Sequence, residues 1–231
     1  MQLLQDPGDL LDTFVLAPDR LHHPQPLAAA QIEAVLIDLP VAAIKTGMLL
    51  NPGLIEAAAA ALAPLLIPRL IDPVMVSRAG SLLLEPQAIE AYRQRLLPLA
   101  AVITPNIHEA RLLSGEAVEG AADVERVAER LLALGPQAVL IKGGGLPELR
   151  GRDYLLQRTG SGQWLAHTPV DTPHSHGSGC TLGAAITAEL AKGQALLEAV
   201  RAAKNFVENG LRKGLAIGAG QGPLCHWHPL L

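Results

Sequence analysis

The chain has 231 residues, of which 49% are hydrophobic and 17% are charged, so it can bury a sizeable core and is not a disordered polymer. Its 18 Lys and Arg residues against 22 Asp and Glu residues give a formal net charge of -4, which argues against a general binder of nucleic acid or of anionic membranes. The composition therefore favours a small-molecule partner.

The cysteine content and the apolar segments predict a cytoplasmic protein. Cys180 and Cys225 are too few to staple a chain of this size, so a reducing compartment is expected. The opening residues carry no basic leader, and aspartates interrupt any apolar region there, so no secretory signal is predicted. The most apolar run, residues 57–70, falls short of the ~20 apolar residues that span a bilayer. We predict a helix followed by a buried strand in that run.

Segments of helical periodicity alternate with short aliphatic runs, which is the order expected when helices connect parallel strands. The sequence predicts helices that begin near Leu27, Pro52, Pro86, Ile107, Ala122, Ser178 and Gln194. It predicts strands at residues 42–45, 70–72, 101–104 and 138–142, and an appended hairpin of residues 154–156 and 164–166. The strands are nearly continuous in apolar character, as in a sheet that is covered on both faces. No repeat or linker divides the chain, so one domain over residues 1–231 is expected.

Polar residues end each predicted strand, and ligands of open α/β sheets bind at the carboxyl ends of the strands. Lys45, Asp72 and Lys142 end three of the predicted strands, and Asn106 follows the strand at 101–104 closely. We therefore expect them to line one edge of the sheet together.

The segment from Gly177 to Cys180 is the most informative part of the sequence. Gly177 and Gly179 allow a sharp turn and a close backbone approach, and the helix predicted from Ser178 supplies unpaired N–H groups with a positive dipole end. We predict an anion hole there for a phosphate or for a phosphoryl group in transfer. A structural glycine turn is the alternative. Cys180 in the first helical turn is expected to have a lowered pKa.

Two other strand ends support an anion site, although each has a simpler explanation. Lys142 stands before a run of glycines, where it can pair with phosphate oxygens or be a solvated turn lysine. Asn106 and Glu109 lie three residues apart at a helix start, where they can organise a hydrated magnesium ion. Alternatively, they form an N-cap and its capping-box partner. The convergence of these elements at one edge favours the functional interpretation.

Five ordered motifs resemble the hydroxymethylpyrimidine/phosphomethylpyrimidine kinases of thiamine biosynthesis. They are Lys45-Thr46-Gly47-Met48-Leu49, Asp72-Pro73-Val74-Met75-Val76, Thr104-Pro105-Asn106-Ile107-His108-Glu109-Ala110, Lys142-Gly143-Gly144 and His176-Gly177-Ser178-Gly179-Cys180-Thr181-Leu182. The resemblance implies a ribokinase-like three-layer α/β/α sandwich with a mostly parallel sheet. It also implies transfer of the γ-phosphoryl group of Mg-ATP to 4-amino-5-hydroxymethyl-2-methylpyrimidine and then to its monophosphate.

The resemblance also implies a role for each matched residue. Cys180, at the position of an aspartate base in related sugar kinases, would belong with Gly177, Ser178 and Gly179 to the catalytic anion hole. Lys142 would contact the ATP phosphates, Asp72 would face the transfer region, and Asn106 with Glu109 would organise magnesium indirectly. Met48 and Val74 would contact the pyrimidine.

The resemblance stops near the N-terminus. Members of the family open with a strand and a glycine-rich segment that binds the pyrimidine, and residues 1–20 have no match to it. We therefore expect the chain to lack the first strand unit of the sheet.

Other functions remain open at this stage. Pyridoxal kinase activity is a near alternative because that family shares the fold, and a catalytically impaired nucleotide-binding module is another. A homodimer is possible. A hydrolase is disfavoured because no Gly-x-Ser-x-Gly elbow surrounds Ser178. Structural zinc is disfavoured because the His and Cys residues lack the paired spacing of such sites.

Overall fold

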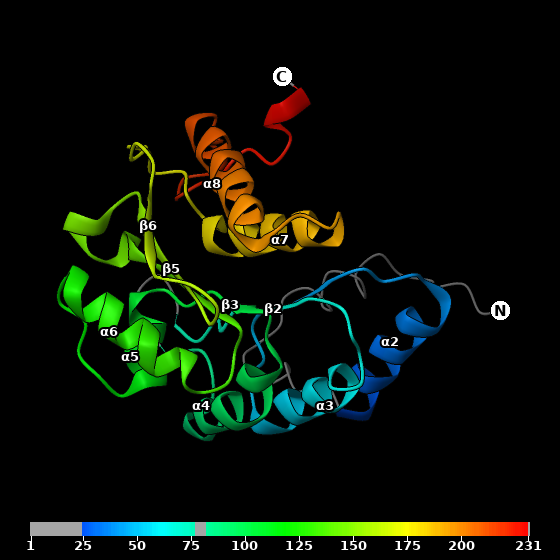
Figure 1. Ribbon diagram of the computed structural model, residues 1–231. Helices are drawn as coiled ribbons and strands as arrows, with labels where there is room; N and C mark the ends of the chain where they lie inside the picture. The colour runs from blue at the N-terminus through cyan, green and yellow to red at the C-terminus, as the bar shows by residue number, and fades with distance from the viewer. Residues whose placement is uncertain (1–24, 77–81, 231) are drawn as a thin grey trace.

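One mixed sheet organises the chain. The computed structural model describes residues 25–76 and 82–230, and its strands form a six-stranded sheet in the order β1-β2-β3-β4-β5-β6 (Figure 1). The strand bounds are β1 Ile44–Thr46, β2 Arg69–Ile71, β3 Val102–Ile103, β4 Ala138–Lys142, β5 Arg152–Gln157 and β6 Gln163–Ala166. Strands β1 to β4 run parallel, whereas β5 and β6 are antiparallel. The predicted strands and the appended hairpin are confirmed.

The helices also begin close to their predicted positions. They are α2 Gln25–Asp38, α3 Pro52–Leu62, α4 Pro86–Ala91, α5 Ile107–Ser114, α6 Ala121–Leu132, α7 Ser178–Ala191 and α8 Leu196–Arg212. A π-turn over Tyr92–Leu96 and a 3-10 turn over Leu97–Leu99 continue α4, and further 3-10 turns cover Gly143–Gly145, Pro147–Leu149 and His228–Leu230. The largest differences from the predicted starts are Gln25 against Leu27 and Leu196 against Gln194.

Local capping explains where two of these helices begin and end. The Asn51 side chain accepts a hydrogen bond from the Leu54 amide at 3.0 Å, and Pro52 occupies the first turn of α3. Gly115 ends α5 with a φ of 74°, a left-handed conformation that favours glycine. These signals are local in sequence, which is why the helix starts could be predicted.

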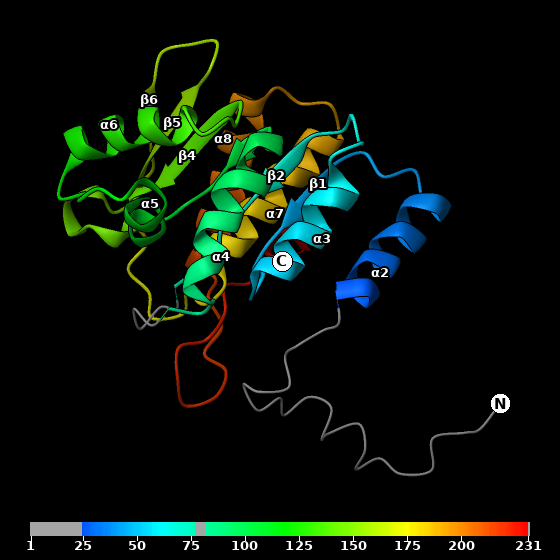
Figure 2. The ribbon, with the colours of Figure 1, turned by 90° about the horizontal axis from the view of Figure 1, so that it is seen from below.

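Helices cover the sheet on both faces, which gives three layers. Helices α7 and α8 lie on one face and α3 to α6 on the other, whereas α2 lies beside α3 at the end away from the β5–β6 hairpin (Figures 1 and 2). Neighbouring strand residues alternate between the two cores: Leu70 packs with the α7–α8 side, and Ile71 with the α3–α6 side. The predicted three-layer α/β/α sandwich is confirmed.

The prediction for residues 1–20 lies outside the described residues, so the absence of a first strand unit stays a prediction. Within residues 25–76 and 82–230, no helix combines the length and the apolar character needed to cross a membrane.

Candidate active site

The carboxylate of Asp72 is the centre of a polar cluster at the carboxyl ends of the parallel strands. Asp72 is fully buried. Lys45 Nζ lies 3.3 Å from its Oδ2 atom, and Lys142 Nζ lies 3.0 Å from its Oδ1 atom. The Thr104 hydroxyl donates to the same Oδ1 at 3.0 Å. The structure therefore brings together side chains from four adjacent strand ends, as the sequence predicted.

Asn106 and Glu109 form a complete capping box at the start of α5. Asn106 Oδ1 accepts the Glu109 amide at 2.9 Å, and Glu109 Oε2 accepts the Asn106 amide at 2.8 Å. Glu109 Oε1 also accepts the Met75 amide at 3.3 Å. The capping box, which the sequence offered as the alternative to a magnesium site, is thus formed. Both oxygens of the buried Glu109 carboxylate accept hydrogen bonds from backbone amides.

Electrostatic coupling links Lys142 to the two buried carboxylates. Burial alone would lower the pKa of Lys142, but attraction to Asp72 and Glu109 outweighs it and raises that pKa. Burial raises the pKa of Glu109 in spite of the opposing charge of Lys142. Lys142 therefore carries a positive charge close to Gly179 at the start of α7.

The first turn of α7 contains two backbone amides that have no acceptor in the described part of the chain. Gly177 has a φ of 79° and precedes the helix without a side-chain cap. The Ser178 amide donates to Ser175 O at 3.3 Å and the Thr181 amide to Gly177 O at 2.9 Å. No acceptor among the described residues takes the amides of Gly179 or Cys180. These two N–H groups, at a positive helix end, are suited to an anion.

Glycines let α7 approach the Asp72 cluster closely. A Cβ atom on Gly179 would lie 3.4 Å from Lys142 Nζ. A Cβ atom on Gly183 would lie 2.7 Å from Lys45 Cε and 3.6 Å from Asp72 Oδ2. The amides at the start of α7 and the two lysines therefore belong to one site.

The expected low pKa of Cys180 is wrong. Burial of the thiol raises its pKa, and the carboxylate of Asp72 raises it further, whereas Lys45 and Lys142 offset only part of the shift. The sequence indicated the helix terminus but not the negative charge of Asp72 that acts on the thiol. The thiol is therefore protonated at neutral pH.

This raised pKa predicts slow alkylation of Cys180 although the residue is exposed. The rate with iodoacetamide should rise with pH through a midpoint above the ordinary value for a cysteine thiol, because only the thiolate reacts. Mass spectrometry over a pH series measures this midpoint. Cys180→Ser is the control, since the remaining Cys225 is buried. A midpoint below the ordinary value would contradict the prediction.

The residues predicted to contact the pyrimidine lie in the loops after β1 and β2. Met48 is exposed and Val74 is half-buried. The hydroxyl of buried Tyr92 donates to Gly47 O at 2.9 Å and so fixes the backbone just before Met48. Contact of Met48 and Val74 with a substrate stays a prediction.

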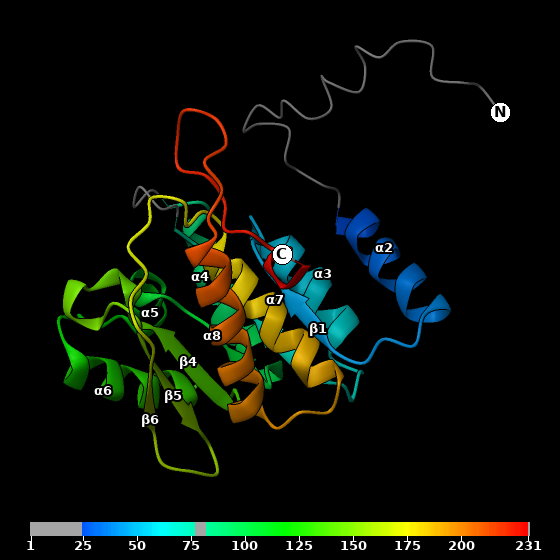
Figure 3. The same ribbon diagram turned by 90° about the horizontal axis from the view of Figure 1, so that it is seen from above.

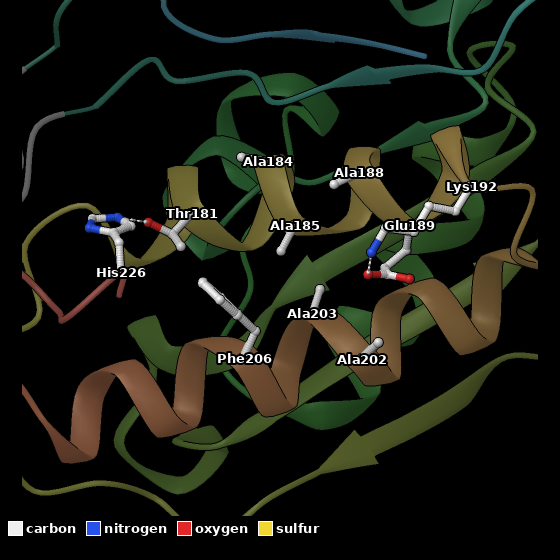
Figure 4. A pocket seen from close by; sticks show the side chains of 10 residues that line it. All are labelled: Thr181, Ala184, Ala185, Ala188, Glu189, Lys192, Ala202, Ala203, Phe206 and His226. Atoms are coloured by element: carbon white, nitrogen blue, oxygen red, sulfur yellow. Dashed lines mark hydrogen bonds and ion pairs between the residues drawn. The ribbon is translucent and has the colours of Figure 1, made fainter. Parts of the chain in front are cut away.

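A hollow of about 400 Å³ lies between α7 and α8, away from the Asp72 cluster. Figure 4 shows that alanines and Phe206 line most of it, with the Lys192–Glu189 pair at one end and the Thr181–His226 pair at the other. Neither Asp72 nor Lys142 lines this hollow. Its shape therefore does not mark the reacting centre.

Sequence reasoning placed Lys45 and the strand end at Thr104 at this edge of the sheet, but it missed the contacts that they make with Asp72. The position of Lys45 at a strand end was the signal for its role, but the ion pair with Asp72 depends on tertiary contact. Thr104 stands at the next strand end in the same way. The bond of 3.0 Å between Thr181 Oγ1 and His226 Nε2 spans 45 positions and has no local signal.

The described residues contain no group of three or more His, Cys, Asp or Glu side chains that could hold a metal ion. His174 instead accepts a hydrogen bond from the Gly222 amide through Nδ1 at 3.1 Å. Both cysteines are free.

Comparison with known proteins identifies the family. The sequence model described as phosphomethylpyrimidine kinase matches residues 19–225, well over half of the chain. This chain belongs to the phosphomethylpyrimidine kinase family. It is 53% identical to the hydroxymethylpyrimidine/phosphomethylpyrimidine kinase of Synechococcus elongatus over 87% of this chain and 77% of that protein. It is 43% identical to the Haemophilus influenzae protein of the same name, over 89% and 78% of the two chains.

A solved structure supports the ribokinase-like fold of this family member. The ADP complex of Bacillus subtilis pyridoxal kinase matches with a TM-score of 0.81 and 38% sequence identity. The match covers 87% of this chain and 76% of that one.

Proposed function

We propose that this protein is a phosphotransferase that phosphorylates 4-amino-5-hydroxymethyl-2-methylpyrimidine and then its monophosphate, with ATP as the donor, in thiamine biosynthesis. Family membership supports the reaction class, and the names of its relatives support the pyrimidine substrate. The observation that carries the proposal is the pair of amides of Gly179 and Cys180 beside Lys142, which donate to no acceptor within residues 25–76 and 82–230.

In the proposed reaction, the hydroxymethyl oxygen attacks the γ-phosphorus of ATP. The new O–P bond forms as the bond to the β,γ-bridging oxygen breaks, ADP leaves, and the hydroxyl proton passes to solvent. The amides of Gly179 and Cys180 would stabilise the charge on the transferring group, and Lys142 would pair with the phosphate oxygens. Gly177 and Ser178 would shape the anion hole, and Asp72 would hold both lysines in place.

Cys180 is not required to act as a base in this scheme. Its thiol is protonated at neutral pH because of the raised pKa, and phosphoryl transfer depends mainly on positioning and charge stabilisation. We propose that its amide binds the phosphoryl group and that its side chain packs beside the transfer path.

Magnesium would be held mainly by the nucleotide phosphates, as is usual for this ion. The carboxylate of Glu109 is buried and accepts two backbone amides, so it does not fit a direct ligand. Asn106 and Glu109 would act on a hydrated ion only through water. Met48 and Val74 are the proposed apolar contacts to the pyrimidine.

An assay of the purified protein with Mg-ATP and hydroxymethylpyrimidine tests the proposal. Product analysis by mass spectrometry should show the monophosphate and then the diphosphate. Folded protein that forms neither product would refute the proposed activity. ATP binding without pyrimidine binding, measured by calorimetry, would instead favour the impaired nucleotide-binding module.

Pyridoxal kinase activity is the second candidate. The structural match to the Bacillus subtilis pyridoxal kinase favours it, and the names of the relatives with higher identity favour the pyrimidine. Pyridoxal in the same assay separates the two, since the better substrate is the one with the higher kcat/KM.

Replacing Cys180 by alanine is expected to lower kcat more than it weakens ATP binding. The backbone amides, which the substitution keeps, hold the ground-state phosphate, whereas the side chain lies beside the transferring group. Steady-state kinetics and calorimetry with a non-hydrolysable ATP analogue measure the two effects. An equal loss of both would contradict this division of roles.

We further propose that the chain functions as one kinase domain in the cytoplasm, without nucleic-acid or membrane partners. The net charge of -4 supports the part of this proposal that concerns nucleic-acid and membrane partners. A homodimer remains a proposal that analytical ultracentrifugation would test.

A further inference from the structure

The segment Gly222–His226 lies between α8 and the phosphate loop, which we define as residues 174–181. On the side of α8, Leu224 and Cys225 are buried, and the Cys225 amide donates to Gly210 O at 2.9 Å. A Cβ atom on Gly210 would lie 2.9 Å from Leu224 Cδ1, so the segment packs tightly on the helix. Figure 3 shows this C-terminal part of the chain beside the start of α7. The segment is therefore anchored on a rigid element.

The other side of the segment holds the phosphate loop at three points. The His176 amide donates to Gly222 O at 3.3 Å, and the Gly222 amide donates to His174 Nδ1 at 3.1 Å. A Cβ atom on Gly222 would lie 1.7 Å from Leu215 O, so only glycine fits there. The third point is the bond between Thr181 Oγ1 and His226 Nε2 at 3.0 Å.

The direction of this third bond follows from the donors available. The Thr181 hydroxyl has one proton and donates it to Gly177 O at 2.9 Å, so it accepts from His226 Nε2–H. Figure 4 shows the His226 ring pointing at this hydroxyl at one end of the hollow between α7 and α8. These two hydrogen bonds therefore connect His226 to Gly177 through Thr181, across the helical turn that contains the amides of Gly179 and Cys180.

We propose that His226 is a positioning residue for phosphoryl transfer, acting through Thr181 to hold the Gly179 and Cys180 amides in their reactive geometry. The proposal rests on the proposed function and deepens it. Donors that stabilise a transition state must be fixed before the reaction, because reorganising them during it costs rate. Among the described residues, no side chain caps the start of α7, so contacts from the segment Gly222–His226 add to the bonds within the loop itself.

The first experiment compares His226→Ala with His226→Gln, which retains an N–H donor near the position of Nε2. His226→Ala should lower kcat about five- to tenfold, the size expected for one hydrogen bond, and His226→Gln should restore most of the loss. Trp227→Ala is the matched control, because this neighbouring side chain is half-exposed and lies outside the bond to Thr181. Thermal unfolding of all variants separates positioning from stability.

The second experiment removes the acceptor. Thr181→Val keeps the shape but loses the hydroxyl and should match His226→Ala, whereas Thr181→Ser keeps the hydroxyl and should stay near wild type. The double variant Thr181→Val/His226→Ala should be no slower than either single variant, because both substitutions remove the same hydrogen bond. The proposal would be overturned if His226→Ala had the kcat of the wild type, or if Trp227→Ala lowered kcat as much as His226→Ala does. It would also be overturned if the loss of kcat in the double variant were the product of the losses in the two single variants.

A third measurement separates this proposal from the proposed function. If the wild type turns over no pyrimidine, the same variants are compared for affinity to AMP-PCP by calorimetry. Weaker binding by His226→Ala, restored in His226→Gln, would support the positioning role alone. Unchanged binding would overturn that role, and absence of nucleotide binding by the wild type would overturn both proposals.

Discussion

Replacing Asp72 by asparagine is expected to lower the free energy of unfolding by about 3 kcal/mol and kcat by about 100-fold or more. The carboxylate is fully buried and faces the ammonium groups of Lys45 and Lys142 at 3.3 and 3.0 Å. Asparagine has almost the same shape but removes the negative charge that both ammonium groups face. Loss of the attraction that holds Lys142 should also lower its pKa, since Asp72 is a main cause of its raised value.

Urea unfolding and steady-state kinetics measure the two effects of this substitution. Glu198→Gln is the matched control, because Glu198 pairs with Arg201 at 2.9 Å on the exposed surface of α8. Loss of such a pair should cost less than about 1 kcal/mol and leave kcat unchanged. Asp72→Asn with the stability and turnover of the wild type would show that the cluster around Asp72 is not the working site.

Replacing Gly183 by valine is expected to cost about 2–3 kcal/mol of stability and to lower kcat at least about tenfold. A Cβ atom at this position would already lie 2.7 Å from Lys45 Cε and 3.3 Å from Leu70 Cδ2. The larger side chain must push α7 away from the sheet or displace Lys45 from Asp72. Either movement shifts the amides of Gly179 and Cys180 relative to the lysines.

A double-mutant cycle identifies which contact causes the loss. If Lys45 is the obstacle, Gly183→Ala should destabilise the wild type but not the Lys45→Ala background, where alanine can even favour the helix. Ala184→Val is the control on the exposed side of the same helix and should change the free energy of unfolding by less than about 1 kcal/mol. Equal costs of Gly183→Ala in both backgrounds would exclude Lys45 as the cause.

Much of the fold and of the site could be predicted because the signals are local. The alternation of Leu70 with Ile71 between the two cores follows from a strand that is buried on both faces. The meeting of Asp72 with Lys142 follows from the rule that parallel strands end at one edge. The capping box of Asn106 and Glu109 follows from a spacing of three residues.

The remaining features depend on partners that are distant in sequence. The pKa of Cys180 is raised because Asp72, 108 positions earlier by residue number, lies close enough to act on the thiol. Buried Lys204 on α8 pairs with Asp153, whose other oxygen accepts the Gly143 amide at 3.1 Å. No residue close in sequence to Lys204 or Asp153 indicates that the two side chains pair. A motif can therefore place a residue at the site without fixing its charge state.

The positions that build the site are spread from Lys45 on the first described strand to His226 near the end of the chain. During synthesis, the ribosome would release the phosphate loop before the segment Gly222–His226 that anchors it, and contacts between such distant residues form late. A nascent or prematurely terminated polypeptide would therefore hold the amides of Gly179 and Cys180 less rigidly than the full chain does. Completion of translation would act as the last step in assembling a competent kinase.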